Sequence, residues 1–206
     1  LGRTFARSTP LLLSASLSFD QLYEEVEGDS ASAAELYALL SAISGVPIRQ
    51  DVCITGAVNQ DGVILPIGGV TEKIEGVFAA FEQTGLTGEQ GVIIPRHNVQ
   101  NLVLRRRVRE AVTHGRFHIW AIDRIEQGWP ILTGLEAGEK QEDGLFPEGS
   151  VHRMVVDQLD EFVREWRSMG EADEGGGEGE GGGVVGGGGI GVVKLHIILA
   201  VHRNFS

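Results

Sequence analysis

Short apolar runs alternate with helical patterns along most of this sequence, and the alternation limits the folds open to the chain. Strands are predicted from short apolar runs, at residues 11–19, 51–58, 63–67, 91–95 and 116–122. Helices are predicted mainly from apolar residues spaced by three and four, at residues 30–44, 70–84, 98–113, 123–133 and 150–169. The alternation predicts an α+β fold with α/β-like layering, in which helices cover a sheet.

Composition divides the chain into three parts. Residues 1–133 are predicted to form one domain, and residues 134–170 a Gly-rich polar linker followed by an amphipathic helix. Residues 171–206 begin with a stretch of Gly, Glu and Val that buries too little apolar surface to offset its ordering entropy, so we expect a disordered tail. The apolar residues 192–201 are shorter than the roughly 20 residues that span a bilayer, and no membrane partner is expected.

The charge and the cysteine content exclude some classes of function. The net charge of −12 and the pI of about 4.9 argue against nucleic acid as a main partner, because phosphate binding needs a basic face. A single cysteine, Cys53, does not form an internal disulfide, so an oxidising compartment is not required and the cytoplasm is the expected location. The first residues have neither an initiator Met nor a signal-peptide layout, which favours an internal piece of a longer polypeptide.

Ser30 is the first candidate for chemistry, because it opens a helix that is apolar on nearly all sides. A serine at this place has a plain structural interpretation, as an N-cap whose side chain accepts a backbone hydrogen bond. Small neighbours, however, leave Ser30 open to a substrate, and the start of a helix offers free N–H groups that stabilise an oxyanion. The position therefore suits a nucleophile as well as a cap.

A nucleophilic serine needs a base, and Lys73 is the stronger candidate. None of the six histidines has site-like neighbours and no G-x-S-x-G motif occurs, so a Ser-His-Asp triad stays open without a motif to support it. Lys73 follows a double glycine, and its apolar neighbours Val70 and Ile74 favour the neutral amine that accepts a proton. The alternative is a surface lysine paired with Glu72 or Glu75.

Several segments together resemble the peptidase domain of Lon proteases. They are VEGDSASAAELYALLSAISG at 26–45, Pro47, DVCITG at 51–56, LPIGGVTEKIEGV at 65–77 and VIIP at 92–95. Their order and spacing match the family over residues 11–133, and E-G-D-S-A-S is similar to the serine motif of the LonB-like branch. The resemblance implies a layered fold of the ribosomal-protein-S5 domain-2-like type.

The resemblance also implies roles for individual residues. In the family the serine of this motif is the nucleophile and the lysine of G-G-x-x-x-K is the base, which implies Ser30 and Lys73. Thr55 resembles the threonine that steadies the lysine, and Asp29 is the usual neighbour of the serine in the LonB-like motif. Ser32 is a competing serine, but choosing it requires a two-residue gap in the match.

The family further implies an ATP-dependent serine endopeptidase that hydrolyses unfolded or damaged proteins through an acyl-enzyme and assembles as a hexamer. The chain has no G-x-x-x-x-G-K-[ST] motif, so ATP is expected to be used by an upstream module and not by these residues. No metal is expected, since no Cys/His cluster has metal spacing. The chain as it stands is expected to be inactive or poorly assembled if that module and the first strands precede it.

Two other functions fit parts of the sequence. A GHMP-type small-molecule kinase has a similar Ser- and Ala-rich loop that cradles phosphate, but Glu27 and Asp29 would place two carboxylates beside that phosphate. A non-catalytic Lon-like domain that only supports oligomerisation would need neither Ser30 nor Lys73.

Overall fold

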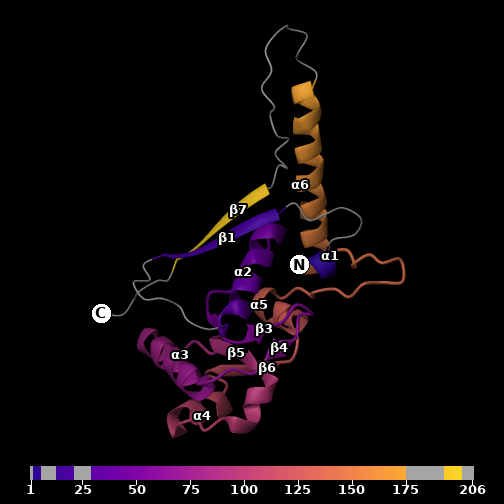
Figure 1. Ribbon diagram of the computed structural model, residues 1–206. Coiled ribbons are helices and arrows are strands. Elements are labelled where there is room, and N and C mark those ends of the chain that lie inside the picture. Colours follow the sequence, from indigo (N-terminus) through magenta and orange to yellow (C-terminus); the bar gives the residue numbers. More distant parts are fainter. Residues whose placement is uncertain (1, 6–12, 21–28, 175–192, 201–206) are drawn as a thin grey trace.

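The computed structural model describes residues 2–5, 13–20, 29–174 and 193–200 of the chain (Figure 1). In chain order its α-helices, strands and 3-10 helices are α1 (Gly2–Phe5), β1 (Leu13–Asp20), α2 (Ser32–Ser44), β2 (Val52–Ile54), β3 (Ala57–Val58), β4 (Ile64–Leu65), α3 (Val70–Thr84), β5 (Gly91–Pro95), η1 (Arg96–Asn101), α4 (Arg106–Thr113), β6 (His118–Ile122), η2 (Ile125–Gly128), α5 (Trp129–Thr133), α6 (Val151–Glu174) and β7 (Val193–Ala200).

A three-stranded parallel sheet lies at the centre of the domain, with β5 between β2 and β6. Cys53 pairs with Val92, and Val92 pairs with Ile119 on the other side. Every residue of β5 is buried, which is typical of a strand covered on both faces. Its side chains alternate, since Ile93 packs in one hydrophobic cluster while Val92 and Ile94 pack in another.

Helices cover both faces of this sheet, so the domain has three layers (Figure 1). On one face, α3 and α4 contribute Ile74, Phe78 and Val108 to the cluster around Val92. On the other face, α2, α5 and α6 form the larger cluster, which includes Ile93. The predicted mixture of helices and strands, with helices on a sheet, is confirmed.

Helix α2, which follows Ser30, is buried as its composition predicts. The hydroxyl of Tyr37 donates to the carbonyl oxygen of Ile125 at 2.6 Å, and its ring packs edge-on against Trp129. Burial, with a smaller contribution from the nearby charge of Glu126, raises the pKa of the Tyr37 hydroxyl and keeps it a neutral donor. These contacts fix α2 against the segment that follows β6.

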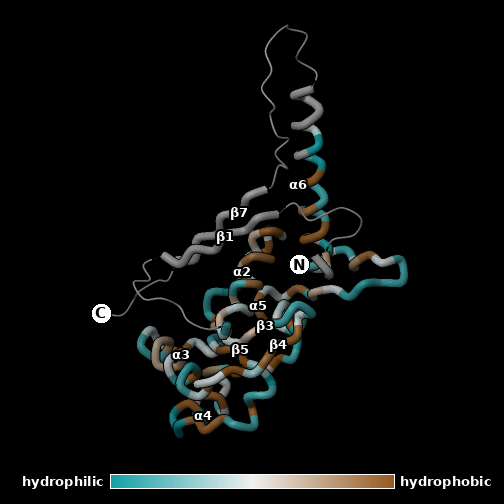
Figure 2. The backbone as a smooth tube through the Cα atoms, in the orientation of Figure 1, coloured by the Kyte–Doolittle hydropathy of each residue, from teal (hydrophilic) through white to brown (hydrophobic). Residues whose placement is uncertain are grey.

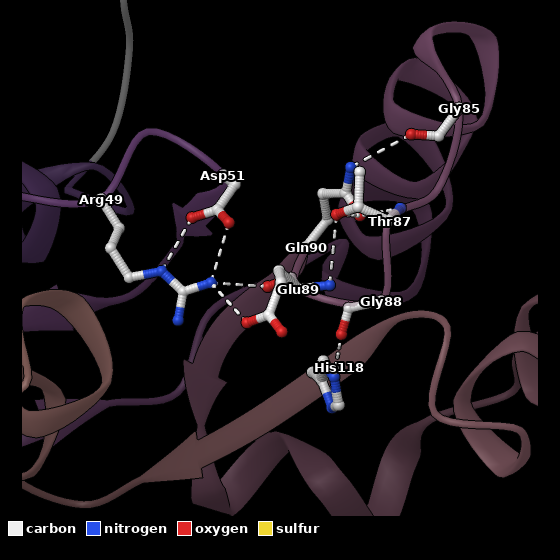
Figure 3. Close-up of polar contacts among 8 residues, drawn as sticks. All are labelled: Arg49, Asp51, Gly85, Thr87, Gly88, Glu89, Gln90 and His118. Carbon is white, nitrogen blue, oxygen red and sulfur yellow. Dashed lines mark hydrogen bonds and ion pairs between the residues drawn. The ribbon is translucent and has the colours of Figure 1, made fainter.

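Polar contacts hold the amino ends of the three parallel strands together (Figure 3). Nε and Nη2 of Arg49 donate to the carboxylate of Asp51 at 2.9 and 2.8 Å, and Nη2 also donates to the carbonyl oxygen of Glu89 at 2.9 Å. The hydrogen bonds from Arg49 lower the pKa of Asp51. Nε2 of His118, at the start of β6, lies 2.8 Å from the carbonyl oxygen of Gly88. The carboxyl ends of the strands, where ligands bind in open parallel sheets, carry none of these residues.

The predicted strand at 51–58 is broken in the structure. β2 ends at Ile54 and β3 begins at Ala57. The N–H of Gly56 donates to the carbonyl oxygen of Ser30 at 2.8 Å, and the carbonyl oxygen of Gly56 accepts from the N–H of Ala33 at 3.1 Å. The backbone of Gly56 is therefore bonded to the start of α2 and not to a neighbouring strand.

Beyond this break, β3 and β4 form a hairpin whose turn contains Asp61-Gly62. Ala57 pairs with Leu65 and Val58 pairs with Ile64 in an antiparallel ladder. Gly62 has a φ of 77°, a value that favours glycine at this turn.

Two predicted helices are each divided. In place of one helix at 98–113, the chain forms η1, an extended segment, and α4. The cause is tertiary, because residues 98–105 make hydrogen bonds to α3 and to Ile67, three residues before it. The predicted helix at 123–133 is divided into η2 and α5, with Pro130 in the first turn of α5.

The C-terminal part differs most from the prediction. The helix predicted at 150–169 continues to Glu174, four residues into the stretch for which we expected disorder. Within that same stretch, β7 pairs in parallel with β1 along eight residues. The prediction missed this strand because its partner lies 180 residues earlier in the chain, and local composition carries no information about such a pairing. Residues 21–28, 175–192 and 201–206 lie outside the described residues. The division of the chain at residues 133 and 170 stays a prediction.

Hydropathy along the backbone follows the layers (Figure 2). Hydrophobic residues gather on α2, whereas hydrophobic and hydrophilic residues alternate along α6, as expected for an amphipathic helix. In the part of the chain that the structure describes, no helix combines the length and the hydropathy needed to cross a membrane.

Candidate active site

Ser30 lies in the turn before α2 and is half-buried. The helix begins two residues later than predicted, its N-cap is Ala31, and no side chain caps it. The side chain of Ser30 therefore does not act as an N-cap. Its carbonyl oxygen is held by the N–H of Gly56, which ties the serine to the segment just after β2.

Lys73 lies in the first turn of α3, and its amine reaches Ser30. Nζ of Lys73 is 2.7 Å from Oγ of Ser30, well within hydrogen-bond distance. Among the described carboxylates none forms an ion pair with Lys73, and Glu75 is bound to Arg105 instead. The alternative interpretation of Lys73, as a surface lysine paired with Glu72 or Glu75, is therefore wrong for the described residues.

Thr55, the first residue after β2, lies beside both groups. Its Oγ1 accepts from Nζ of Lys73 and donates to the carbonyl oxygen of Ser30, each at 3.4 Å. Its N–H donates to the carbonyl oxygen of Ile93 at 3.0 Å, so the residue is anchored to the central strand. Both contacts of the hydroxyl are long for hydrogen bonds, and the sheet fixes the position from which Thr55 makes them.

Asp29 and Ser32 are placed differently from these three residues. Asp29 is exposed, its carbonyl oxygen accepts from the N–H of Ser32, and no described contact joins its carboxylate to Ser30 or Lys73. Oγ of Ser32 accepts from the N–H of Val58 at 3.0 Å, so this hydroxyl supports β3. The structure thus brings together Ser30, Lys73 and Thr55, but not the side chain of Asp29.

The backbone amides at this helix start are partly used. The N–H of Ser32 donates to the carbonyl oxygen of Asp29, and that of Ala33 donates to Gly56. For the N–H groups of Ser30 and Ala31, no acceptor is recorded among the described residues. An oxyanion beside Oγ of Ser30 would therefore meet the amides of Ser30 and Ala31 before those further along α2.

The histidines with described side chains do not contact the serine. His118 bonds to Gly88 and stacks on Trp120, and His152 bonds to Gly138. Burial raises the pKa of the Cys53 thiol on β2, which keeps it protonated and unreactive. In the described part of the chain no group of three or more His, Cys, Asp or Glu residues could hold a metal ion.

One buried residue near the site is not predicted from the sequence. Asn98 is 5 % exposed, and its amide bonds both backbone groups of Ile67, the residue before the double glycine. The sequence places Asn98 in a predicted basic helix, where its pattern does not distinguish it from a solvent-facing residue. An asparagine three residues after the end of the buried VIIP strand is the only local signal.

Known proteins carry the same segments. The family described as Lon protease (S16) C-terminal proteolytic domain matches residues 25–127, which include Ser30, Thr55 and Lys73. The chain belongs to this family. Its Lon proteolytic domain has the site at the carboxyl end of the parallel sheet, between α2 and α3.

Named relatives agree with this membership. A Lon protease homolog of Escherichia coli is 53% identical over 122 residues, which are 59% of this chain and 21% of that protein. A Lon protease homolog of Haemophilus influenzae is 39% identical over 150 residues, 73% of this chain and 25% of that protein. An archaeal Lon protease of Archaeoglobus fulgidus is 37% identical over 125 residues, 61% of this chain and 18% of that protein. The chain spans about a fifth to a quarter of the length of these relatives.

Proposed function

We propose that this domain is a serine endopeptidase in which Ser30 is the nucleophile and Lys73 its general base. The observation that carries the proposal is the 2.7 Å distance between Oγ of Ser30 and Nζ of Lys73. A base within about 2.6–3.2 Å of the proton it removes meets the geometric requirement for general-base catalysis. Membership of the Lon proteolytic family supplies the reaction class.

The geometry supports a two-step reaction. Neutral Lys73 accepts the hydroxyl proton of Ser30 while Oγ attacks the carbonyl carbon of the substrate peptide bond. The amides of Ser30 and Ala31 stabilise the resulting oxyanion, and such donors are worth about 2.7–4 kcal/mol each in the transition state. The ammonium of Lys73 then gives its proton to the leaving amine, which leaves an ester on Ser30.

Hydrolysis of the ester repeats the sequence with water. Lys73 accepts a proton from water, the hydroxide attacks the ester carbonyl, and the proton returns to Oγ as the acid leaves. Thr55 steadies the amine during both steps through its contacts to Lys73 and to the backbone of Ser30. Asp29, exposed and without a described contact to the pair, is assigned no step.

Finer features of the function are also proposals. E-G-D-S-A-S and the archaeal relatives favour the LonB-like branch, and the family favours the S5 domain-2-like fold. Because the relatives are several times longer, we propose that an ATPase module outside these residues uses ATP to unfold and deliver damaged proteins. Hexameric assembly and a cytoplasmic location belong to the same proposal.

The alternatives have less support. A phosphate-binding loop of the kinase type needs a run of free amides at the start of α2, but beyond Ser30 and Ala31 the amides of Ser32 and Ala33 donate to backbone carbonyls. A scaffold without catalysis leaves the short contact between Ser30 and Lys73 without a purpose. Calorimetry with ATP and a peptidase assay separate these functions.

The decisive test compares Ser30→Ala and Lys73→Met in the longest polypeptide that carries this sequence. A fluorogenic peptide measures turnover, and a fluorophosphonate probe followed by mass spectrometry identifies the labelled serine. We expect both variants to lose turnover, and labelling to occur on Ser30 alone. Lys140→Met is the matched control, since Lys140 is exposed and contacts Phe146 instead of the site. Turnover by either site variant at the unaltered rate would refute the dyad.

A further inference from the structure

We infer that Asn98 is a positioning residue for Lys73, acting through Ile67 and the double glycine at the start of α3. The inference rests on the proposed dyad and adds the element that sets its geometry. Residues 98–105, here called the strap, run beside the first turns of α3 and are bonded to them. Asn98 is the buried end of this strap.

The side chain of Asn98 binds one residue at both of its backbone groups. Oδ1 accepts from the N–H of Ile67 at 3.0 Å, and Nδ2 donates to the carbonyl oxygen of Ile67 at 2.8 Å. This is the pairing that a neighbouring strand would make, here supplied by one amide side chain. Since Asn98 is only 5 % exposed, losing either bond leaves a buried polar group without a partner.

Between Ile67 and Lys73, the only buried side chain is that of Val70, which packs in the cluster of Ile74 and Phe78. Gly68 and Gly69 carry no side chains, and Gly69 lies in the left-handed region with a φ of 63°. Its carbonyl oxygen accepts from the N–H of Lys73 at 3.0 Å, which closes the first turn of α3. Because glycines permit many backbone conformations, contacts from elsewhere must set the place where the helix begins. The pair of hydrogen bonds from Asn98 to Ile67, here called the clamp, is such a contact, six residues before Lys73 in the chain.

The strap makes two more bonds along the same side of α3. The N–H of Val103 donates to Oγ1 of Thr71 at 3.4 Å, and the N–H of Arg105 donates to Oε1 of Glu75 at 2.9 Å. Nε of Arg105 also lies 2.8 Å from Oε2 of Glu75, whose side chain is 13% exposed. The two bonded positions on α3, Thr71 and Glu75, are spaced by four, so they lie on one side of the helix.

Lys73 extends from a different side. It lies two residues from Thr71 and from Glu75, which is roughly 200° around the helix axis. One side of the first two turns is thus held by the strap, while the amine on the other reaches Oγ of Ser30. A displacement of about 1 Å in such a geometry costs up to roughly 100-fold in rate. The clamp therefore matters for turnover more than for substrate binding.

Three variants test the inference by steady-state kinetics, with melting temperature measured in parallel. Asn98→Asp keeps the acceptor but turns a second oxygen toward the carbonyl of Ile67, and Asn98→Leu removes both bonds. The control is Asn101→Leu, because Asn101 is an exposed residue at the end of the same 3-10 helix. Assays run well below the melting temperature of each variant, in the longest polypeptide that carries the sequence.

We expect kcat to fall roughly 10- to 100-fold in folded Asn98 variants, with KM within about 2-fold of the unaltered protein and the control unchanged. Unaltered kcat in a folded Asn98 variant would overturn the inference, and so would a rise in KM alone. If every Asn98 variant fails to fold, its role is fold integrity and the inference is also overturned. A wrong assignment of the Ser30–Lys73 dyad is recognised separately, because Ser30→Ala would then retain turnover, independently of the kinetics of the Asn98 variants.

Discussion

Replacing Thr55 by valine removes one hydroxyl from the centre of the site and leaves the shape of the side chain nearly unchanged. Oγ1 of Thr55 lies 3.4 Å from Nζ of Lys73 and 3.4 Å from the carbonyl oxygen of Ser30. The backbone N–H of residue 55 still donates to Ile93 in the variant, so β2 keeps its end. The change therefore separates the hydroxyl from the position that the sheet gives the residue.

The two contacts of the Thr55 hydroxyl set limits on how much activity the variant should lose. A neutral hydrogen bond contributes about 0.5–1.5 kcal/mol net, and lengths of 3.4 Å place both of these at the lower end. Together they amount to roughly 1–2 kcal/mol. At about 1.36 kcal/mol for each factor of ten, Thr55→Val should lower kcat/KM about 5- to 30-fold.

Peptide turnover of Thr55→Val and Thr55→Ser, with the melting temperature of each, checks this reasoning. Serine keeps the hydroxyl, so Thr55→Ser should retain most of the activity. The melting temperature of Thr55→Val should fall by only a few degrees, since about 1 kcal/mol shifts a domain of this size by roughly 2–4 °C. Equal kcat/KM for Thr55→Val and the unaltered protein would show that the hydroxyl has no part in steadying the lysine.

Two further predictions follow from single contacts. Ser32→Ala removes the acceptor for the N–H of Val58 and should lower the free energy of unfolding, measured in urea, by about 1 kcal/mol. Fluorophosphonate labelling of the variant should still occur on Ser30, and loss of that labelling would make Ser32 the nucleophile. Burial lowers the pKa of His152, so the folded protein keeps this ring neutral at a pH where the unfolded chain binds a proton, and stability should be lost as pH falls below about 6.5. His152→Gln should reduce this loss between about pH 7.5 and about pH 5.5, whereas the exposed His97→Gln should follow the unaltered protein; parallel curves for all three would exclude His152 as the cause.

Local patterns predict the elements that hold the site but not the contacts that shape it. The bounds of α3, residues 70–84, agree with the prediction because apolar residues at spacings of three and four are flanked by glycine at both ends. The apolar neighbours of Lys73 are also placed as predicted, since Val70 and Ile74 are buried. These features depend on residues close in sequence, which periodicity describes well.

Long-range bonds account for the failures. The strand predicted at 51–58 breaks at Gly56 because its backbone bonds to the start of α2, about 25 residues earlier. The helix predicted at 98–113 is interrupted because the strap bonds to Thr71 and Glu75 across about 30 residues. Neither partner is visible in a window of 15 residues. The arginines that follow the strap have good helical propensity and do form α4, whereas the strap itself follows its tertiary hydrogen bonds.

The two ends of the sheet are organised for different purposes. At the amino ends, charged groups such as Arg49 and Asp51 bond to each other and to backbone, which satisfies them and fixes the spacing of the strands (Figure 3). At the carboxyl ends, Thr55 contacts the amine of Lys73 and the backbone carbonyl of Ser30, which lie at the starts of helices on opposite faces of the sheet. Helix α2 is held to the sheet through Gly56, and α3 is held by the packing of Ile74 and Phe78 on β5 and by the strap. The 2.7 Å contact between Ser30 and Lys73 is therefore a consequence of restraints that lie outside the dyad itself.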